Sequence, residues 1–378
     1  MKKILLGTSA LVAAAAIFAG AANAAQTPKV TVGGTSDFQV GIVGEDNDAN
    51  LRSGAFRTET EVNVKVDAKT DAGLGYGAQI DLALSGHNDQ DNNTDQLNHS
   101  WIYVDGAWGK IEGGSTYGVA ANMKVDASRI ARATGGVDGD FTYFVTPTSG
   151  RVIATPDLFL DYGTTGAVQL GDESQEAINK VNYYTPRFSG FQAGVSYLFD
   201  TTALDRGIKL SRADNTSGEA ENVFIGALNY QGKFSNVGVE VGATGEWGNA
   251  ESNTQEDLRT YQVGAKVSYM GFSVAGSYAN LGDSLQTKTT TNDSSTYFWT
   301  VGGAYETGPF GASVTYLASQ VDGGTTHNDF SNLSFGVDYK LAAGLTPYAE
   351  VNFVDIDPTG TANDNDATVF IAGTQLSF

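Results

Sequence analysis

Apolar and polar residues alternate with a period of two through almost the whole of this 378-residue chain. The pattern is clearest over residues 56–67, where Phe, Thr and Val fall on one face and Arg, Glu, Asn, Lys and Asp fall on the other. Because successive side chains of a β-strand point to opposite faces, this period predicts strands. A soluble sandwich and a membrane barrel both accept such a strand, so the alternation alone does not separate these two fold classes.

The connections between the candidate strands do separate them. Tight connections such as 71–73 and 307–308 alternate with long polar ones such as 86–96 and 200–220. Short turns at one end and long loops at the other are typical of a transmembrane antiparallel β-barrel, which closes without a free edge. We therefore expect an all-β barrel of about 16 strands. The candidate strands lie near residues 29–43, 55–70, 74–86, 97–107, 109–117, 179–186, 190–199, 221–232, 237–248, 258–269, 271–281, 296–306, 309–319, 329–340, 345–355 and 366–378.

The N-terminus predicts export. Two lysines precede an apolar run that ends near residue 19, and residues 22–24 read Ala-Asn-Ala, which fits a signal-peptide cleavage site. The run is shorter than the ~20 apolar residues that a spanning helix needs, and no later run is longer. We therefore predict a signal peptide over residues 1–24 and a barrel pore over residues 25–378. Cleavage would remove two lysines and no acid, and so change the net charge from −21 to −23.

Charge and residue content narrow the function classes. A strongly acidic chain repels nucleic acid, and the absence of cysteine excludes disulfides, thiolate catalysis and cysteine-ligated zinc. His99 and Ser100 are neighbours on one candidate strand, so their side chains point to opposite faces and do not form a base–nucleophile pair. We expect no enzyme activity, no catalytic residue, no bound metal and no cofactor, with only a loose attraction of divalent cations to the acidic loops.

Two stretches carry a resemblance to a known family. Residues 100–119, "SWIYVDGAWGKIEGGSTYGV", are similar to a hairpin that ends in a Gly-Arg-x-Tyr-Gly-like sequence. Residues 179–197, "NKVNYYTPRFSGFQAGVSY", look like a strand pair with the pattern Asn-Ser-x-Arg-Tyr-x-Ser-Pro-x-Phe-x-Gly-Phe, and this match is the more specific one. It aligns Asn179, Tyr183, Pro186, Phe188, Gly190 and Phe191 around one short turn. Over essentially its whole mature length the chain resembles the general diffusion porins of Gram-negative outer membranes.

The resemblance implies a homotrimer of 16-stranded barrels in the outer membrane, each a water-filled channel for passive diffusion of ions and small hydrophilic solutes. In this family the third loop folds into the pore and places acidic groups opposite a basic wall. The resemblance also makes Phe378, which ends the last strand, the signal read by the barrel insertion machinery. Lipopolysaccharide and outer-membrane lipid are the expected surroundings.

The third loop corresponds to residues 118–177, a segment of roughly 60 residues that is far longer than ordinary connections. Its candidate pore groups are Asp126, Asp138, Asp140, Asp157 and Asp161, with Arg129, Arg132 and Arg151 among them. On the wall, alternation places five polar side chains opposite the apolar face, where they would line water. These are Arg57, Glu59, Glu61, Asn63 and Lys65.

The resemblance also exposes two departures from the family pattern. Arg57 matches a wall arginine, but Ser115 and Asn182 stand where the pattern has arginines. One unit charge at close range shifts the energy of an ion by about 1 kcal/mol or more at an effective dielectric constant near 20. Two missing positive charges therefore predict a pore that prefers cations.

Other interpretations remain open at this point. Residues 141–147 and 157–163, "FTYFVTP" and "DLFLDYG", could be two further strands of an 18-stranded, substrate-specific channel, for example for sugars. Separately, Trp101 and Tyr103, on the expected inward face, could form an aromatic track that guides sugars. A barrel that conducts nothing is a third class, although a 16-stranded barrel leaves an aqueous channel unless something fills it.

Overall fold

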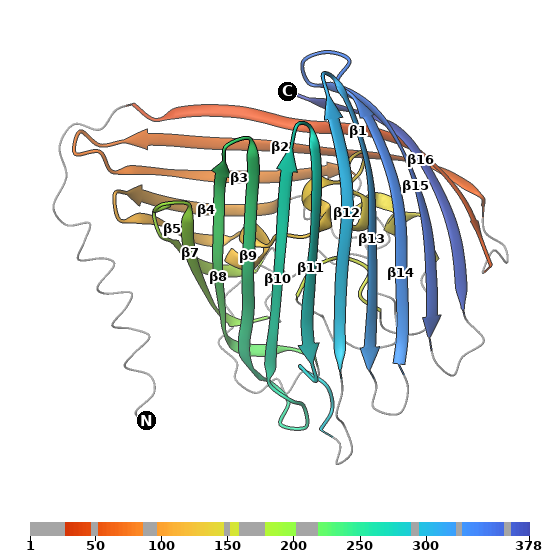
Figure 1. The fold of residues 1–378 in the computed structure, drawn as a ribbon. Helices are drawn as coiled ribbons and strands as arrows, with labels where there is room; N and C mark the ends of the chain where they lie inside the picture. Colours follow the sequence, from red (N-terminus) through yellow and green to blue (C-terminus); the bar gives the residue numbers. More distant parts are fainter. Residues whose placement is uncertain are drawn as a thin grey trace.

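The computed structural model describes residues 27–46, 52–85, 97–146, 152–158, 178–201, 218–288, 295–322, 327–358 and 364–378. Sixteen antiparallel strands form one closed barrel, in which each strand pairs with its sequence neighbours and β1 pairs with β16 (Figure 1). The strands are β1 (Lys29–Glu45), β2 (Gly54–Lys69), β3 (Gly75–Ser85), β4 (Leu97–Gly106), β5 (Gly109–Ser115), β6 (Asn179–Tyr184), β7 (Phe191–Asp200), β8 (Ala220–Phe234), β9 (Val237–Ala250), β10 (Leu258–Tyr269), β11 (Phe272–Gly282), β12 (Thr296–Thr307), β13 (Phe310–Asp322), β14 (His327–Tyr339), β15 (Leu345–Pro358) and β16 (Asn365–Ser377).

The predicted barrel of sixteen strands is confirmed, with strand ends that differ from the expected ones by a few residues. The two additional strands of the 18-stranded alternative are not needed to close the ring. Of the first, residues 141–146 are described, and they continue the short helix η3 (Asp140–Tyr143) into a turn instead of forming a strand. Of the second, only Asp157 and Leu158 are described, and neither belongs to a strand.

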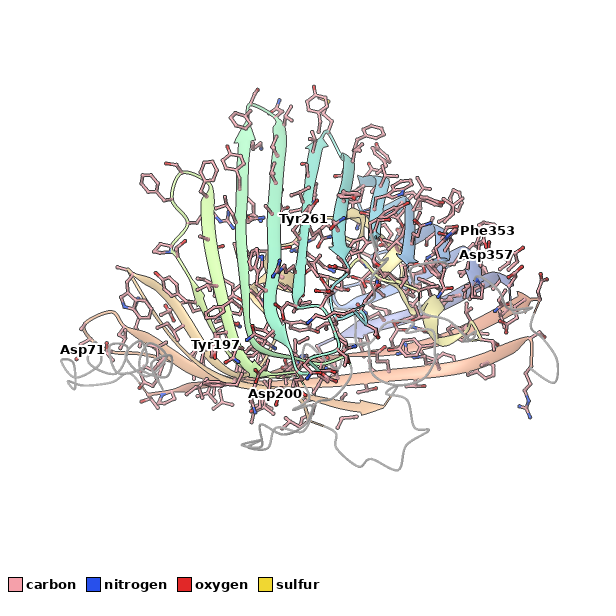
Figure 2. The ribbon with its side chains drawn as sticks, turned by 90° about the horizontal axis from the view of Figure 1, so that it is seen from below. Asp71, Tyr197, Asp200, Tyr261, Phe353 and Asp357 are labelled. Atoms are coloured by element: carbon pink, nitrogen blue, oxygen red, sulfur yellow. The ribbon has the colours of Figure 1, made fainter. Side chains whose placement is uncertain are left out.

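The alternation of the sequence sorts side chains between the two faces of the wall. Phe56 is 76% exposed, whereas the side chain of the next residue, Arg57, is only 10% exposed. Large apolar residues such as Phe38 and Ile102 share the exposed face with Phe56. Aromatic side chains project away from the wall near the strand ends (Figure 2). An outward apolar face with aromatic girdles is the arrangement that a lipid bilayer requires of a barrel.

In the chain between β5 and β6, the described residues form four short helices: α2 (Val119–Met123), η1 (Ala127–Ile130), η2 (Gly136–Asp138) and η3. We call its described residues, 116–146 and 152–158, the long segment. No helix of the described residues is long and apolar enough to cross a membrane. The long segment touches the face of the wall opposite the apolar one. Along its length, backbone N–H groups donate to wall hydroxyls, namely Val119 to Ser196, Ala127 to Thr300 and Arg132 to Ser313.

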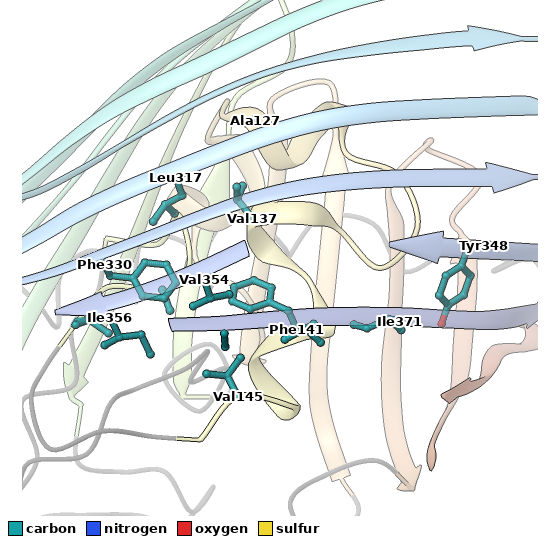
Figure 3. Close-up of a cluster of buried hydrophobic side chains, with 14 residues drawn as sticks. Ala127, Val137, Phe141, Val145, Leu317, Phe330, Tyr348, Val354, Ile356 and Ile371 are labelled. Carbon is teal, nitrogen blue, oxygen red and sulfur yellow. The ribbon is translucent and has the colours of Figure 1, made fainter. Parts of the chain in front are cut away.

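A hydrophobic core joins the long segment to strands β13–β16 (Figure 3). Phe141 of the segment and Phe330 of β14 are both buried, and their ring centroids lie 6.5 Å apart. Val354 and Ile371 contribute from β15 and β16. The wall therefore buries apolar side chains on its non-lipid face as well, wherever the long segment covers it.

Candidate functional site

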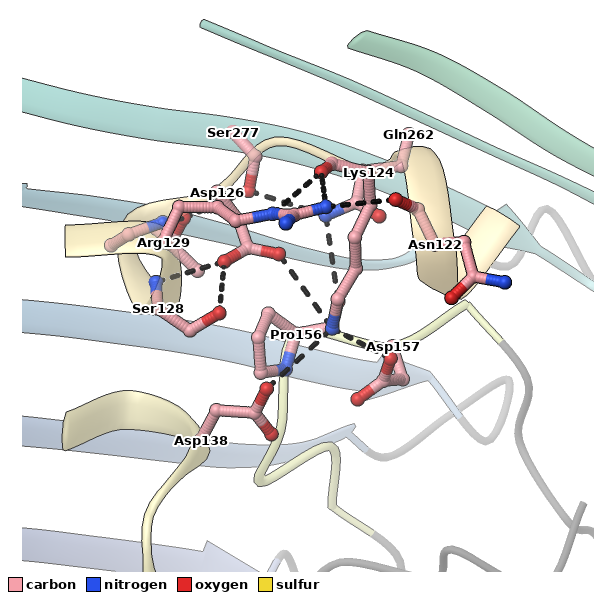
Figure 4. Close-up of polar contacts among 12 residues, drawn as sticks. Asn122, Lys124, Asp126, Ser128, Arg129, Asp138, Pro156, Asp157, Gln262 and Ser277 are labelled. Atoms are coloured by element: carbon pink, nitrogen blue, oxygen red, sulfur yellow. Dashed lines mark hydrogen bonds and ion pairs between the residues drawn. The ribbon is translucent and has the colours of Figure 1, made fainter. Parts of the chain in front are cut away.

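The ammonium group of Lys124 lies among three carboxylates of the long segment (Figure 4). Its Nζ is 2.7 Å from Oδ1 of Asp157 and 3.6 Å from Oδ2 of both Asp126 and Asp138. It also donates to the carbonyl oxygen of Pro156 at 3.3 Å. One lysine thus joins the outgoing part of the segment to the returning part.

Burial and charge act in opposite directions on this group. Burial lowers the pKa of Lys124, but Asp157, Asp138 and Asp126 outweigh it, and the pKa stands well above its usual value. Lys124 is therefore a cation at neutral pH, and its cluster holds one positive and three carboxylate groups. Asp126 is fully buried, whereas the side chains of Asp138 and Asp157 are 32% and 34% exposed.

Local hydrogen bonds fix the turn that carries this cluster. Oδ1 of Asp126 accepts from the backbone N–H of Ser128 at 2.8 Å and from its hydroxyl at 2.6 Å, which caps η1. The guanidinium of Arg129 donates to the carbonyl oxygens of Asn122 and Lys124 at 3.0 and 2.9 Å. Arg129 therefore closes the turn that follows α2.

A second cluster joins the long segment to the wall at β2. Nη1 of Arg57 is 3.2 Å from Oδ2 of Asp140, and its Nη2 is 2.8 Å from Oε2 of Glu59. The Arg57 guanidinium also lies over the Tyr143 ring, 3.8 Å from the centroid, and the Gln39 amide donates to Asp140. The structure thus brings together three of the residues predicted from sequence, Arg57, Glu59 and Asp140.

The carboxyl group of Asp140 has a raised pKa. Burial raises its pKa to about 6, although the nearby Arg57 guanidinium opposes the shift. An ordinary aspartate titrates about two units lower. Asp140 therefore changes its charge in the pH range just below neutrality.

Two wall carboxylates, the buried Glu350 and the exposed Glu306, hold the middle of the long segment. Glu350 of β15 accepts from the backbone N–H groups of Thr134 and Gly136, both at 3.2 Å, and from the Thr134 hydroxyl at 2.9 Å. Nearby, Nη2 of Arg132 is 2.7 Å from Oε2 of Glu306 on β12. Carboxylates that accept backbone N–H bonds are strong anchors, because the bonds are charge-assisted.

A third anchor lies where the barrel closes. Glu45 of β1 accepts from the backbone N–H and hydroxyl of Thr146 at 3.0 and 2.6 Å. The same carboxylate accepts from the Asn365 amide of β16 at 2.9 Å. Glu45 therefore ties the long segment to both strands of the closing pair.

Glycines of the wall make room for the backbone of the long segment. A Cβ atom at Gly264 would lie 1.7 Å from the carbonyl oxygen of Val125, and one at Gly336 would lie 2.7 Å from that of Arg132. At Gly41 it would lie 2.1 Å from the Phe144 ring. These three inward-facing glycines, on β10, β14 and β1, allow an approach that no other residue type permits.

The other wall residues predicted from the sequence lie on the same inner face of β2 as Arg57. Glu61 and Asp81 both accept from the Asn63 amide, at 2.5 and 2.8 Å. The Lys65 side chain is 46% exposed, and its Nζ is 3.2 Å from Asp67. These groups form a mostly acidic strip on the inner face of β2 and β3, which is accessible along β2 and buried at Asp81.

The two positions at which the resemblance leads us to expect arginines are both buried. Ser115 ends β5, in register with Ser100 and Asn179, and is 1% exposed. The Asn182 amide donates to Glu112 at 3.2 Å and to the Tyr117 carbonyl at 2.8 Å. Asn182 therefore supports the residues from which the long segment starts.

Phe378 forms a two-way backbone pair with Gly34, with both N–H to O distances at 3.0 Å, and its side chain is 62% exposed. Asp161, Arg151 and the expected signal peptide over residues 1–24 lie outside the described residues. Sequence reasoning missed the roles of Lys124, Glu45 and Glu350. The sequence contains one indication of a role for Lys124: it is the only lysine between Lys110 and Lys180, and it lies among acidic residues.

The model of the Gram-negative porin family matches residues 9–373. Two relatives cover this chain completely and are covered completely by it: a protein of Rickettsia conorii, 26% identical over 451 residues, and one of Rickettsia typhi, 25% identical over 452.

Among solved structures, the anion-selective porin from Comamonas acidovorans is similar, with a TM-score of 0.61 and 16% identity. A triple mutant of Rhodopseudomonas blastica porin gives a TM-score of 0.59 at 14% identity. Both comparisons cover 93% of this chain and 100% of the other, and at these identities they establish a shared fold.

Proposed function

Because this chain belongs to the Gram-negative porin family, we propose that its pore prefers cations and passes ions and small hydrophilic solutes by passive diffusion. The chain is an integral β-barrel of the outer membrane and a porin channel. A closed barrel of sixteen strands is wide enough for an aqueous channel.

One observation carries the preference for cations: Lys124, Arg57 and Arg132 are each outnumbered by carboxylates, whereas the exposed Arg129 donates to carbonyl oxygens. Lys124 has three carboxylate partners, and Arg57 has two. Arg132 lies 2.7 and 3.8 Å from Glu306 and Asp338. The balance of these clusters is negative, and a negative field focused in a narrow passage concentrates cations.

The sign of the selectivity is a property of side chains, not of the barrel. The similar porin from Comamonas acidovorans is named anion-selective, although it shares the fold. In the present chain, Ser115 and Asn182 stand where the resemblance leads us to expect arginines, and this supports the opposite sign.

The long segment narrows the pore in this proposal. Its support is the set of contacts that follow the wall from Ser196 of β7 round to Arg57 of β2. In this proposal the remaining passage runs along β2 and β3, because Glu59 and Glu61 of β2 are partly exposed. Homotrimer formation and contact with lipopolysaccharide belong to the same proposal, by resemblance to the family. No cofactor is required, because diffusion through water needs none.

The test is single-channel recording of the purified protein in planar bilayers under a potassium chloride gradient. We expect stepwise conductance and a reversal potential with the sign of cation preference. An anion-preferring reversal potential would overturn the selectivity while leaving the channel. An absence of steps, in protein whose barrel is intact by circular dichroism, would overturn the open pore.

A further inference from the structure

The environment of Lys124 differs from those of Arg57 and Arg132, two other basic residues of the site that form ion pairs. Arg57 and Arg132 pair with carboxylates of wall strands, as well as with Asp140 in the case of Arg57. All four oxygen partners of Lys124 belong to the long segment itself: the carboxylates of Asp126, Asp138 and Asp157, and the Pro156 carbonyl. Lys124 therefore joins two parts of the long segment to each other and does not join the segment to the wall.

The chemistry of these partners is that of a cation site. Carboxylate and backbone carbonyl oxygens are the ligands that hard divalent cations such as calcium prefer. In the described part of the chain, however, no group of three acidic or histidine side chains is placed to hold a metal ion. Around Lys124 the oxygens stand 2.7–3.6 Å from an ammonium nitrogen that occupies the centre.

The wall fixes the returning part of this cluster independently. The Pro156 carbonyl also accepts from the Gln262 amide of β10 at 3.4 Å, and the Ile153 carbonyl accepts from the Ser319 hydroxyl of β13 at 2.7 Å. Residues 153–157 are therefore held by the wall as well as by Lys124. Loss of the lysine would change the charge of the cluster more than its position.

We propose that Lys124 is a tethered counter-ion of the constriction. It positions the partly exposed carboxylates of Asp138 and Asp157, and it fills the space in which they would otherwise retain a divalent cation. This role rests on the proposed function, since it matters only if cations pass the long segment.

The consequence concerns the residence time of permeating ions. Conduction requires that ions are attracted strongly enough to enter and held weakly enough to leave. The cluster keeps an excess of negative charge, which attracts cations, while its centre is already occupied by a cation that is covalently part of the chain. A divalent ion passing Asp138 and Asp157 therefore finds attraction but no coordination site.

Two variants test this role in bilayers. Lys124→Met keeps an unbranched side chain that is one atom shorter and removes the charge, and Lys124→Arg, which keeps the charge, is its control. We expect Lys124→Met to shift the reversal potential further toward cation preference. Its potassium conductance should also fall by roughly half at about 1 mM calcium, the affinity range of weak calcium sites. Lys124→Arg and the wild type should keep their conductance at that concentration.

A merely structural role predicts the opposite sign, because a loosened segment would widen the passage and weaken the preference for cations. That result, or a Lys124→Met pore that is insensitive to calcium, would overturn the proposal. The wild type provides a further measurement, which does not depend on the folding of Lys124→Met. Calcium block of the wild-type pore, if Asp138→Asn relieves it, would also overturn the proposal. Conductance steps of the wild type test the open pore itself. A failure of the role of Lys124 is therefore distinguishable from a failure of the proposed channel function.

Discussion

The Arg57 guanidinium on β2 lies 3.2 Å from the Asp140 carboxylate on η3, so an ion pair joins the wall to the long segment. The pair is not neutral in sum, because Glu59 shares the same guanidinium at 2.8 Å. Arg57 is therefore a compensated charge and not a free positive group in the passage. The electrostatics of this cluster depend on whether Asp140 is ionised.

Acidification is expected to weaken the preference for cations. The Asp140 pKa is about 6, and a carboxyl group is negative above its pKa and neutral below it. As the pH falls through 6, the cluster loses one negative charge, while Arg57 keeps Glu59 as a carboxylate partner. The measurement is the reversal potential in a potassium chloride gradient, recorded from neutral pH down to about pH 5, one unit below this pKa.

Asp140→Asn provides the control for this pH dependence. The variant should start with the weaker preference and lose the pH step near 6, because an amide does not titrate. A step of unchanged size in Asp140→Asn would assign the titration to another group and contradict the prediction.

Gly264→Ala is expected to disturb the packing of the long segment against β10. The added methyl would lie 1.7 Å from the Val125 carbonyl oxygen, so the segment must move away from β10. Overpacking of this kind costs about 1–3 kcal/mol. We expect a lower midpoint of thermal unfolding in detergent and a smaller single-channel conductance. Gly303→Ala is the matched control, because the nearest atom to its Cβ is 3.9 Å away. Equal behaviour of the two variants would contradict a seat at Gly264.

The barrel could be predicted from sequence because its physics is local. Alternation assigns Phe56 and Arg57 to opposite faces whatever the rest of the chain does, and turn lengths then set the order of the strands. The long segment follows no such period. Its position depends on single contacts between distant residues, such as Glu350 with Gly136 and Glu45 with Thr146. Neither partner carries a local pattern that would identify the other.

The site was predicted in part for the same reason. Alternation and resemblance together identified Arg57 and Glu59, and acid content identified Asp138, Asp140 and Asp157 as candidates. Which acid meets which base could not be predicted, since Lys124 reaches across 33 positions to Asp157. The burial of Ser115, Asn182 and Asp126 was equally hidden, because it depends on how the long segment covers the wall.

Glu45→Gln is expected to weaken the closing pair of strands. The Glu45 carboxylate accepts from Thr146 and Asn365, and hydrogen bonds to charged groups contribute about 1.5–3 kcal/mol. The amide keeps one acceptor oxygen, so we expect part of this loss as a lower unfolding midpoint in detergent. Asp366→Asn, an exposed substitution on the neighbouring strand end, should leave the midpoint unchanged. A midpoint of Glu45→Gln equal to that of the wild type would contradict the anchor.

Phe378→Ala is expected to distinguish folding of the barrel from its insertion into the outer membrane. The Phe378 side chain is 62% exposed and its pairing with Gly34 uses backbone atoms, so the substitution should barely change refolding of purified protein in detergent. In cells we expect less folded barrel in the outer membrane, because the terminal Phe is the expected signal for insertion. The measurement is the folded fraction in outer-membrane preparations, judged by heat-dependent mobility in gels. Equal losses in detergent and in cells would indicate a structural role instead.

Single cysteines are expected to map the water passage, since the natural chain contains none that would react. Glu61→Cys lies on the accessible strip of β2, and Asn332→Cys replaces a fully buried side chain on the inner face of β14. A cationic thiol reagent added during recording should lower the potassium conductance of Glu61→Cys within the same trace, because it replaces a thiol with a bulky positive charge in the passage. Asn332→Cys should not respond, since the long segment and its core exclude water from that part of the wall. Reaction of Asn332→Cys at a similar rate would place open water beside β14 and contradict a passage that runs along β2 and β3.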